Sequence, residues 1–371
     1  MSLDKFLAEK KSLSGFNVEK DPDIIGLDLN IMKQDYEKGV QIAEPCQIEH
    51  MKDKFAWMRG DQNCWTGFPN DGKTEFSLFM AVVKSLKDRW KWAMWSPEMK
   101  GANFVDGKVK THYNFLAYNI MATISGKTPY KHIYEKYNKR IPLMTIDEIQ
   151  ELKEWIEKHF IFLDPKEKKV EDIEVMLHRI YENQGYDGVF IDPFKNVEAN
   201  LGMRDDQHLN NVFARMKENA VSKNISMNWI AHPRSGINRI ANKQGQDVLL
   251  PCTQYHLSGG AAWDNGMDGI YSIHRPYTLD NLNDPRVVFH NLKQKKQDLV
   301  CERGEVHDIE FNIKTRRYLF NGVDIFTNQV VHPKLEKFPT NGNADEFDIK
   351  TGEVFNMDKA NKILDESEAP F

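Results

Sequence analysis

Apolar and polar positions along the chain form short apolar runs that alternate with segments of helical spacing. Five runs predict strands, at Gln62–Thr66, Trp90–Trp95, Tyr186–Asp192, Ser226–His232 and Met267–Arg275. Apolar residues three and four positions apart predict helices at Thr74–Leu86, Asn114–Ile124, Val170–Asn183, Leu209–Ala220 and from Thr145 onward, where Thr145-Ile-Asp-Glu148 is typical of a capping box. Strands that alternate with helices and end in polar loops predict an α/β fold, whose mostly parallel central sheet binds its ligand at the carboxyl edge.

The later part of the chain departs from this alternation. Val287–Lys293 and Glu305–Phe320 predict a C-terminal β-hairpin or meander, and the polar segment 235–254 predicts a mobile loop. From Pro339 onward, eight acidic residues stand against three basic ones, which predicts a flexible acidic tail.

The beginning of the chain is polar and mixed. An amphipathic helix is expected within residues 29–40, as an arm without a core partner nearby. We therefore expect an arm or linker at 1–40, one motor core at 41–325 and a tail at 326–371.

Composition excludes several classes of protein. The 371 residues are 40% hydrophobic and 28% charged, as in ordinary globular proteins, and we find no apolar run of the roughly 18 residues that a membrane span needs. The four cysteines lack the spacing of a zinc site or a disulfide framework, and the first residues lack the apolar region of a signal peptide. These features predict a cytoplasmic protein without a membrane partner. The net charge of −5 leaves any nucleic-acid contact to particular loops.

The stretch from Cys64 to Phe76 contains Gly-x-x-x-x-Gly-Lys-Thr between a predicted strand and a predicted helix. This pattern is typical of a P-loop, in which backbone N–H groups surround phosphates, Lys73 reaches the β- and γ-phosphates and Thr74 ligates Mg²⁺. A chance glycine turn is the alternative, but the strand and helix on either side favour the P-loop. The candidate nucleotide-binding residues are Gly67, Asn70, Asp71, Gly72, Lys73, Thr74 and Glu75.

Three further polar residues end predicted strands. Asp192 is the candidate second Mg²⁺ anchor, although an Asp before a proline can also simply start a turn. Glu98, after the strand at 90–95, is the candidate for polarising the attacking water, and a solvated Glu after Pro97 is the alternative. His232 could sense the γ-phosphate, or it could be an ordinary structural histidine.

Together these motifs resemble the RecA-like motor of the DnaB/Twinkle ring helicases. The resemblance covers about residues 41–320 and rests on the P-loop segment, on Trp95–Met99, Phe190–Phe194 and Ile230–Arg234, and on Leu257–Asp268. It implies a P-loop NTPase with ATP and Mg²⁺ as cofactors, and a homohexamer that moves 5′ to 3′ on single-stranded DNA. It also implies catalytic roles for Lys73 and Glu98, Mg²⁺ ligation by Thr74 and Asp192, and γ-phosphate sensing by His232.

Two positions depart from the family pattern or fit it loosely. The run that matches the family's trans-acting finger contains Lys293, Lys295 and Lys296, so lysine stands where arginine is usual. A solvated basic strand end is the alternative. Arg317 and Tyr318 resemble the family's pair beside the nucleotide base, and a packed hairpin tyrosine fits the sequence nearly as well.

For DNA, the resemblance points to the loops after Asp192 and His232. The available cations there are Arg204, Arg234, Arg239 and Lys243. Residues 1–40 leave no room for a primase-type domain, so a separate primase, a helicase loader or a single-strand-binding protein is an expected partner.

The function that follows is an ATP-driven replicative DNA helicase of phage-like or bacterial type. Two alternatives stay open: a RecA-type recombinase or annealing ATPase that forms filaments, and a nucleotide-gated DNA-binding or loading factor with weak hydrolysis, which the lysine at the finger position suggests.

Overall fold

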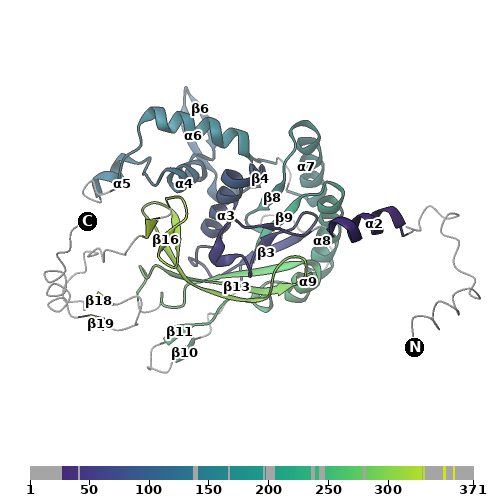
Figure 1. The fold of residues 1–371 in the computed structure, drawn as a ribbon. Helices are drawn as coiled ribbons and strands as arrows, with labels where there is room; N and C mark the ends of the chain where they lie inside the picture. Colours follow the sequence, from purple (N-terminus) through teal and green to yellow (C-terminus); the bar gives the residue numbers. More distant parts are fainter. Residues whose placement is uncertain are drawn as a thin grey trace, which may run out of the picture. The chain divides into compact units, whose positions relative to one another are not determined.

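The computed structural model describes residues 27–40, 42–136, 141–165, 168–194, 197, 205–234, 239–241, 247–278, 281–327, 329–330, 346–347 and 354–355 (Figure 1). The chain divides into two compact units, Met1–Asn328 and Gln329–Phe371. The second unit contains β17 (Gln329–Val330) and the antiparallel pair β18 (Glu346–Phe347) and β19 (Val354–Phe355). The motifs identified in the sequence all lie in the first unit.

A central sheet organises the first unit, with the strand order β16-β15-β14-β13-β12-β3-β9-β8-β4-β7. Its parallel part consists of β3 (Gln62–Thr66), β4 (Trp92–Trp95), β7 (Phe160–Phe162), β8 (Gly188–Ile191), β9 (Ser226–Ile230) and β12 (Gly269–His274). Its antiparallel part consists of β13 (Arg286–Gln294), β14 (Gly304–Asn312), β15 (Arg317–Phe320) and β16 (Val323–Asp324). The predicted mostly parallel sheet with C-terminal antiparallel strands is confirmed.

Helices cover both faces of this sheet (Figure 1). One face packs against α3 (Lys73–Asp88), α4 (Asn114–Ser125) and α6 (Ile146–His159), and the other against α7 (Val170–Gln184), α8 (Asp205–Ser222) and α9 (Gly260–Gly266). The capping box expected at the start of α6 is present, with the Thr145 hydroxyl accepting from the Glu148 N–H at 3.2 Å.

Successive side chains of each strand point to opposite faces of the sheet and so contribute to both layers of the core. In β3, Cys64 belongs to the cluster on the α8 face, whereas the next residue, Trp65, belongs to the cluster on the α3 face. Trp65 packs there against Phe55 and Tyr271, with ring centroids 5.1 and 5.0 Å away. Because successive side chains of a strand point to opposite faces, a strand covered on both sides must be apolar almost throughout.

Several short elements were not expected from the sequence. A hairpin of β5 (Gly101–Val105) and β6 (Lys108–His112) follows β4. In the segment expected to be a loop, β10 (Arg239–Ala241) pairs antiparallel with β11 (Asp247–Leu249). This correction has a local reason, because the register sets Ile240 opposite Val248, two β-branched residues that favour strands. The remaining short elements are β1 (Glu44–Pro45), β2 (Ala56–Trp57), α5 (Lys131–Lys136), η3 (Glu49–Met51), η4 (Pro97–Met99) and η6 (Gln254–His256).

The N-terminal helix α2 (Leu29–Lys38) lies within the predicted range. The Asp28 carboxylate caps it by accepting from the N–H groups of Asn30 and Ile31, at 2.7 and 3.3 Å. Its apolar side chains, Leu29, Ile31 and Met32, are more than half exposed. Among the described residues, no helix is long and apolar enough to cross a membrane.

Close packing between β8 and β4 gives a first prediction. A Cβ added at Gly188 would lie 2.2 Å from Cζ3 of Trp92, so Gly188→Ala should lower the free energy of unfolding by about 1–3 kcal/mol. Urea denaturation measures this loss. In a Trp92→Phe background the smaller ring should reduce the cost of Gly188→Ala, and an equal cost in both backgrounds would contradict the proposed clash.

Candidate functional site

The predicted P-loop lies between the end of β3 and the start of α3, at the carboxyl edge of the parallel strands. Gly72, which precedes the helix, has φ of 84°, a left-handed conformation that favours glycine, and Asn70 has φ of 70°. At Gly67 an added Cβ would lie 2.6 Å from the Ile273 carbonyl oxygen. Both glycines of the motif are therefore required by the local structure, one by its conformation and the other by space.

Contacts from neighbouring strands hold this loop. The Asp71 carboxylate accepts from the Phe68 N–H at 3.1 Å and lies 3.8 Å from Nδ1 of His274, at the end of β12. Arg275 donates to the Asn70 carbonyl at 3.4 Å. His274 and Arg275 were not singled out in the sequence, although they end a predicted strand beside the P-loop strand.

Lys73 is the first residue of α3 and is buried, with 5% of its surface exposed. Burial lowers the pKa of its ammonium group, while the nearby carboxylates of Asp192, Asp71 and Glu98 oppose that change. The structure thus brings four sequence-predicted residues from separate segments close enough to interact electrostatically. A buried ammonium group at a helix N-terminus suits a polyanionic ligand, and the surrounding carboxylates could hold the cation that accompanies it.

Asp192 follows β8 and is 3% exposed. Burial raises the pKa of its carboxyl group to about 6, although the hydroxyls of Thr74 and Ser96 donate to it and Lys73 attracts it. The Ser96 hydroxyl lies 3.2 Å from Oδ2. Ser96 was missed in the sequence, where it is one more small polar residue after a strand.

Glu98 and His232 lie at the ends of neighbouring segments of the same edge. Glu98 is an exposed residue of η4, directly after β4. His232 follows β9 and is half-buried, and the preceding Ala231 accepts from the Thr66 hydroxyl at 3.1 Å. Parallel pairing of β4, β8, β9 and β3 is what gathers these residues at one edge.

A buried thiol also borders the predicted P-loop. Sγ of Cys252 lies 3.3 Å from the Thr66 hydroxyl and interacts with the Gly67 backbone. Burial raises the pKa of this thiol to about 11, so it is protonated at neutral pH. In the sequence it was only one of four unpatterned cysteines.

Arg317 and Tyr318 point to different surroundings. The buried Arg317 side chain is 2.7 Å from Asp324 and donates to the carbonyls of Thr123 and Ile124 at the end of α4. The Tyr318 hydroxyl lies 3.5 Å from the Gly72 carbonyl oxygen. These contacts give Arg317 a structural role and leave Tyr318 as the member of the pair that touches the predicted P-loop.

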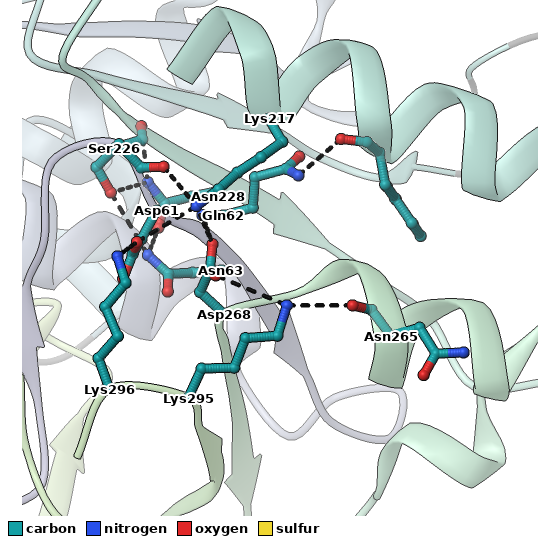
Figure 2. A network of polar contacts seen from close by, with 12 residues as sticks. Asp61, Gln62, Asn63, Lys217, Ser226, Asn228, Asn265, Asp268, Lys295 and Lys296 are labelled. Atoms are coloured by element: carbon teal, nitrogen blue, oxygen red, sulfur yellow. Dashed lines mark hydrogen bonds and ion pairs between the residues drawn. The ribbon is translucent and has the colours of Figure 1, made fainter. Parts of the chain in front are cut away.

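Lys295 and Lys296 of the predicted finger lie near Asp61 and Asp268 (Figure 2). These two aspartates directly precede β3 and β12, so the lysines are at the amino edge of the sheet, opposite the predicted P-loop. There β13 ends beside the start of β12, where Gly269 faces Gln294. Lys296 contacts Asp61 at 2.6 Å, and Lys217 of α8 contacts Asp268 at 2.6 Å and Asp61 at 3.4 Å. Burial raises the pKa of Asp61, and the neighbouring Asp268 adds to the effect.

Lys293 and Lys295 complete this cluster. Lys293 contacts the carbonyl and carboxylate of Asp264, and burial lowers its pKa. Lys295 lies 3.2 Å from the Asn265 carbonyl but 3.7 Å from the Asp268 carboxylate. Its side chain is 42% exposed, against 20% for Lys293. Of the two predicted finger residues, Lys295 is therefore the more exposed and the less tightly held by its neighbours.

Of the predicted DNA-contacting residues, Arg234 is exposed, and its backbone N–H donates to the His256 carbonyl at 2.9 Å. Arg239 begins β10. Arg204 and Lys243 lie outside the described residues.

Comparisons with known proteins agree with the resemblance seen in the sequence. No family model matches the chain. The Twinkle homolog protein, chloroplastic/mitochondrial, of Arabidopsis thaliana is 22% identical over 237 residues, which are 61% of this chain and 30% of that protein. A solved ATPase domain matches with a TM-score of 0.57 at 13% identity, over 78% of this chain and 96% of that one.

A DnaB-like replicative helicase, solved in a study of its interactions with primase, matches with a TM-score of 0.60 at 14% identity, over 85% of this chain and 71% of that one. The chain is thus similar in sequence to this Twinkle homolog and shares the fold of the two solved structures. The predicted RecA-like fold is thereby confirmed. The chain spans 30% of the length of the plant protein, so that protein's activity is not transferred by the match.

The residues present fit the Mg²⁺ and the triphosphate that the sequence resemblance implies. Mg²⁺ prefers oxygen donors, and the Asp192 carboxylate with the Thr74 and Ser96 hydroxyls supplies them beside Lys73. The glycine turn before α3 and the helix N-terminus suit a triphosphate.

The buried carboxyl of Asp192 gives a pH prediction. The folded protein binds this proton more tightly than the unfolded chain does, so the free energy of unfolding falls as pH rises from about 4 to 6. The rise of the pKa from 3.8 to about 6 amounts to roughly 3 kcal/mol at about 1.4 kcal/mol per tenfold change. Without nucleotide, Asp192→Asn should therefore be more stable than the wild type at pH 7.5, by up to that amount.

Urea denaturation between pH 4 and 8 measures this difference, which should shrink towards pH 4. The variant Asp298→Asn, at an exposed position, controls for the loss of one carboxylate. A stability difference for Asp192→Asn that does not change with pH would contradict the assignment.

Proposed function

We propose that this chain is the motor of an ATP-dependent replicative DNA helicase. The observation that carries the proposal is the convergence of Lys73, Asp192 and Glu98 at the N-terminus of α3, in a chain related to DnaB/Twinkle-type helicases. In this proposal the chain forms a homohexameric ring, moves 5′ to 3′ on single-stranded DNA and hydrolyses ATP between subunits.

Each residue of the site has a chemical role in this proposal. The backbone of Gly67–Gly72 and the Lys73 ammonium group bind the β- and γ-phosphates, and Thr74 and Asp192 hold Mg²⁺, which neutralises charge on the phosphates. Glu98 is exposed and close to this cluster, so it can orient a water molecule and accept its proton as the water attacks the γ-phosphate. His232 would respond to the γ-phosphate from the end of β9.

The DNA contact follows from the same edge of the sheet. His232 is two residues from the exposed Arg234, so a change at the phosphate can reach the segment that we propose for DNA binding. Arg239, Arg204 and Lys243 belong to this proposal as further phosphate-binding cations. A primase, a loader or a single-strand-binding protein would be separate partners.

The position of Lys295 favours action on a neighbouring subunit. Residues 61–66 run along the sheet from the amino edge to the predicted P-loop, and a strand rises about 3.3 Å per residue, so the two sites lie roughly 16–20 Å apart within one chain. A lysine side chain cannot cover that distance. Four lysines share three carboxylates in the cluster, Asp61, Asp264 and Asp268, which leaves one positive charge for an outside anion.

The arm would support the same assembly. The exposed apolar residues of α2 suit docking on the neighbouring subunit, with 41–325 as the motor and 326–371 as a tail. A cytoplasmic location is part of this proposal.

ATP hydrolysis with and without single-stranded DNA tests the function. The wild type should be stimulated by DNA and should assemble with ATP and Mg²⁺ to a sixfold mass. Lys73→Ala should lose nucleotide binding, because it removes the cation from the phosphate site. Glu98→Gln should keep ATP binding but lose at least about a hundredfold in turnover. Equal hydrolysis by the wild type and Glu98→Gln, or no DNA stimulation in any oligomeric state, would contradict the motor.

Mixing experiments test the trans action of Lys295. Lys295→Ala should lose hydrolysis and regain it when mixed with Lys73→Ala, because the intact lysine of one subunit then completes the intact nucleotide site of the other. Lys296→Ala removes the same charge one residue away, but its ammonium group contacts Asp61, so it should mainly lower thermal stability. Without rescue, Lys295 acts within its own subunit or not at all.

A further inference from the structure

A further acidic residue lies directly beside the predicted phosphate site. Glu75 follows Thr74 in the first turn of α3, and its side chain is only 20% exposed. Its Oε1 accepts from Nη1 of Arg316 at 3.1 Å and from the amide nitrogen of Asn119 at 3.3 Å. Burial raises the pKa of this carboxyl group, and the Arg316 guanidinium counteracts the rise.

Arg316 reaches Glu75 from a distant part of the sequence. It lies in the turn between β14 and β15 with φ of 56°, and its carbonyl accepts from the Thr123 hydroxyl of α4 at 3.0 Å. The next residue, Arg317, turns the other way to Asp324. The turn thus separates two adjacent arginines and directs only Arg316 to the start of α3.

The pair also lies close to the glycine turn of the predicted P-loop. Tyr318, whose hydroxyl is 3.5 Å from the Gly72 carbonyl, interacts electrostatically with both Glu75 and Arg316. A carboxylate in the first helical turn normally gains from the helix dipole. When the same turn must hold a polyphosphate, that carboxylate instead repels the ligand, and the low dielectric of a buried site strengthens the repulsion.

We propose that Arg316 is a positioning residue that neutralises Glu75 and so preserves the affinity of the α3 N-terminus for a polyphosphate. The inference rests on the proposed nucleotide site. Because the effect is electrostatic, it grows with the number of phosphate groups that lie at the α3 N-terminus, from a nucleoside monophosphate to a triphosphate. A contact that only holds the fold would change the affinity for all three nucleotides alike.

The test measures binding of ATP, ADP and AMP to the full chain with Mg²⁺ by calorimetry. Arg316→Gln keeps a polar but shorter side chain and removes its charge. It should weaken the binding of ATP about tenfold, that of ADP less and that of AMP hardly at all. Glu75→Gln should strengthen ATP binding by about threefold, because Arg316 then adds an uncompensated positive charge. The double variant Glu75→Gln/Arg316→Gln should return to within about threefold of the wild type.

Lys153→Gln is the matched control, since it removes one positive charge from the exposed ion pair with Glu157 on α6 and should leave all three affinities unchanged. The proposal would be overturned if Arg316→Gln lost equal affinity for ATP and AMP, or if the double variant bound ATP no more tightly than Arg316→Gln alone. If Arg316→Gln does not fold, Glu75→Gln decides alone: unchanged or weaker ATP binding overturns the proposal. If the wild type itself does not bind ATP, the proposed nucleotide site fails as well.

Discussion

Parallel pairing of β3 between β9 and β12 is the constraint on which the rest of the structure depends. It pairs both edges of β3, the strand before the predicted P-loop, while helices cover both of its faces, and all five residues of the strand are buried. It also brings the ends of strands that are far apart in sequence to one edge of the sheet. Lys73 and Asp192 are 119 positions apart in the chain, yet Asp192 is the strongest carboxylate influence on Lys73. No local motif could create that pairing.

This topology explains why the sequence predicts most of the strands, helices and candidate site residues. A strand buried on both faces is a continuous apolar run, and such runs identified β4, β8, β9 and β12. The polar residues after the first three, Glu98, Asp192 and His232, were identified with them. The covering helices α3, α4, α7 and α8 showed their 3.6-residue period, and the cap of α6 was visible as Thr145 and Glu148. Because parallel strands end at the same edge, the candidate site residues could be grouped before any geometry was known.

What escaped the sequence depends on contacts between distant residues. The residues of the hairpin β5–β6 are exposed, and apolar and polar residues alternate only weakly along it, so its sequence does not predict strands. Arg316 and Arg317 are equivalent in sequence, and only the left-handed turn at Arg316 decides which of them faces the predicted P-loop. Ser96, Cys252 and His274 gained their positions from the pairing of strands, which composition and spacing do not specify.

The two edges of the sheet differ in the balance of their buried charges, and this difference supports the proposed assembly. At the amino edge, four lysines from α8, from the end of β13 and from the residues after it outnumber the three carboxylates of Asp61, Asp264 and Asp268. At the carboxyl edge, Asp192 lies among hydroxyls, and burial alone raises its pKa more than Lys73 lowers it. An unbalanced buried carboxylate costs stability unless a cation joins it, so this edge suits the Mg²⁺ of the proposed nucleotide site. In the proposed assembly, the positive charge of Lys295, at the far edge of the sheet in one chain, would reach this site in a neighbouring chain.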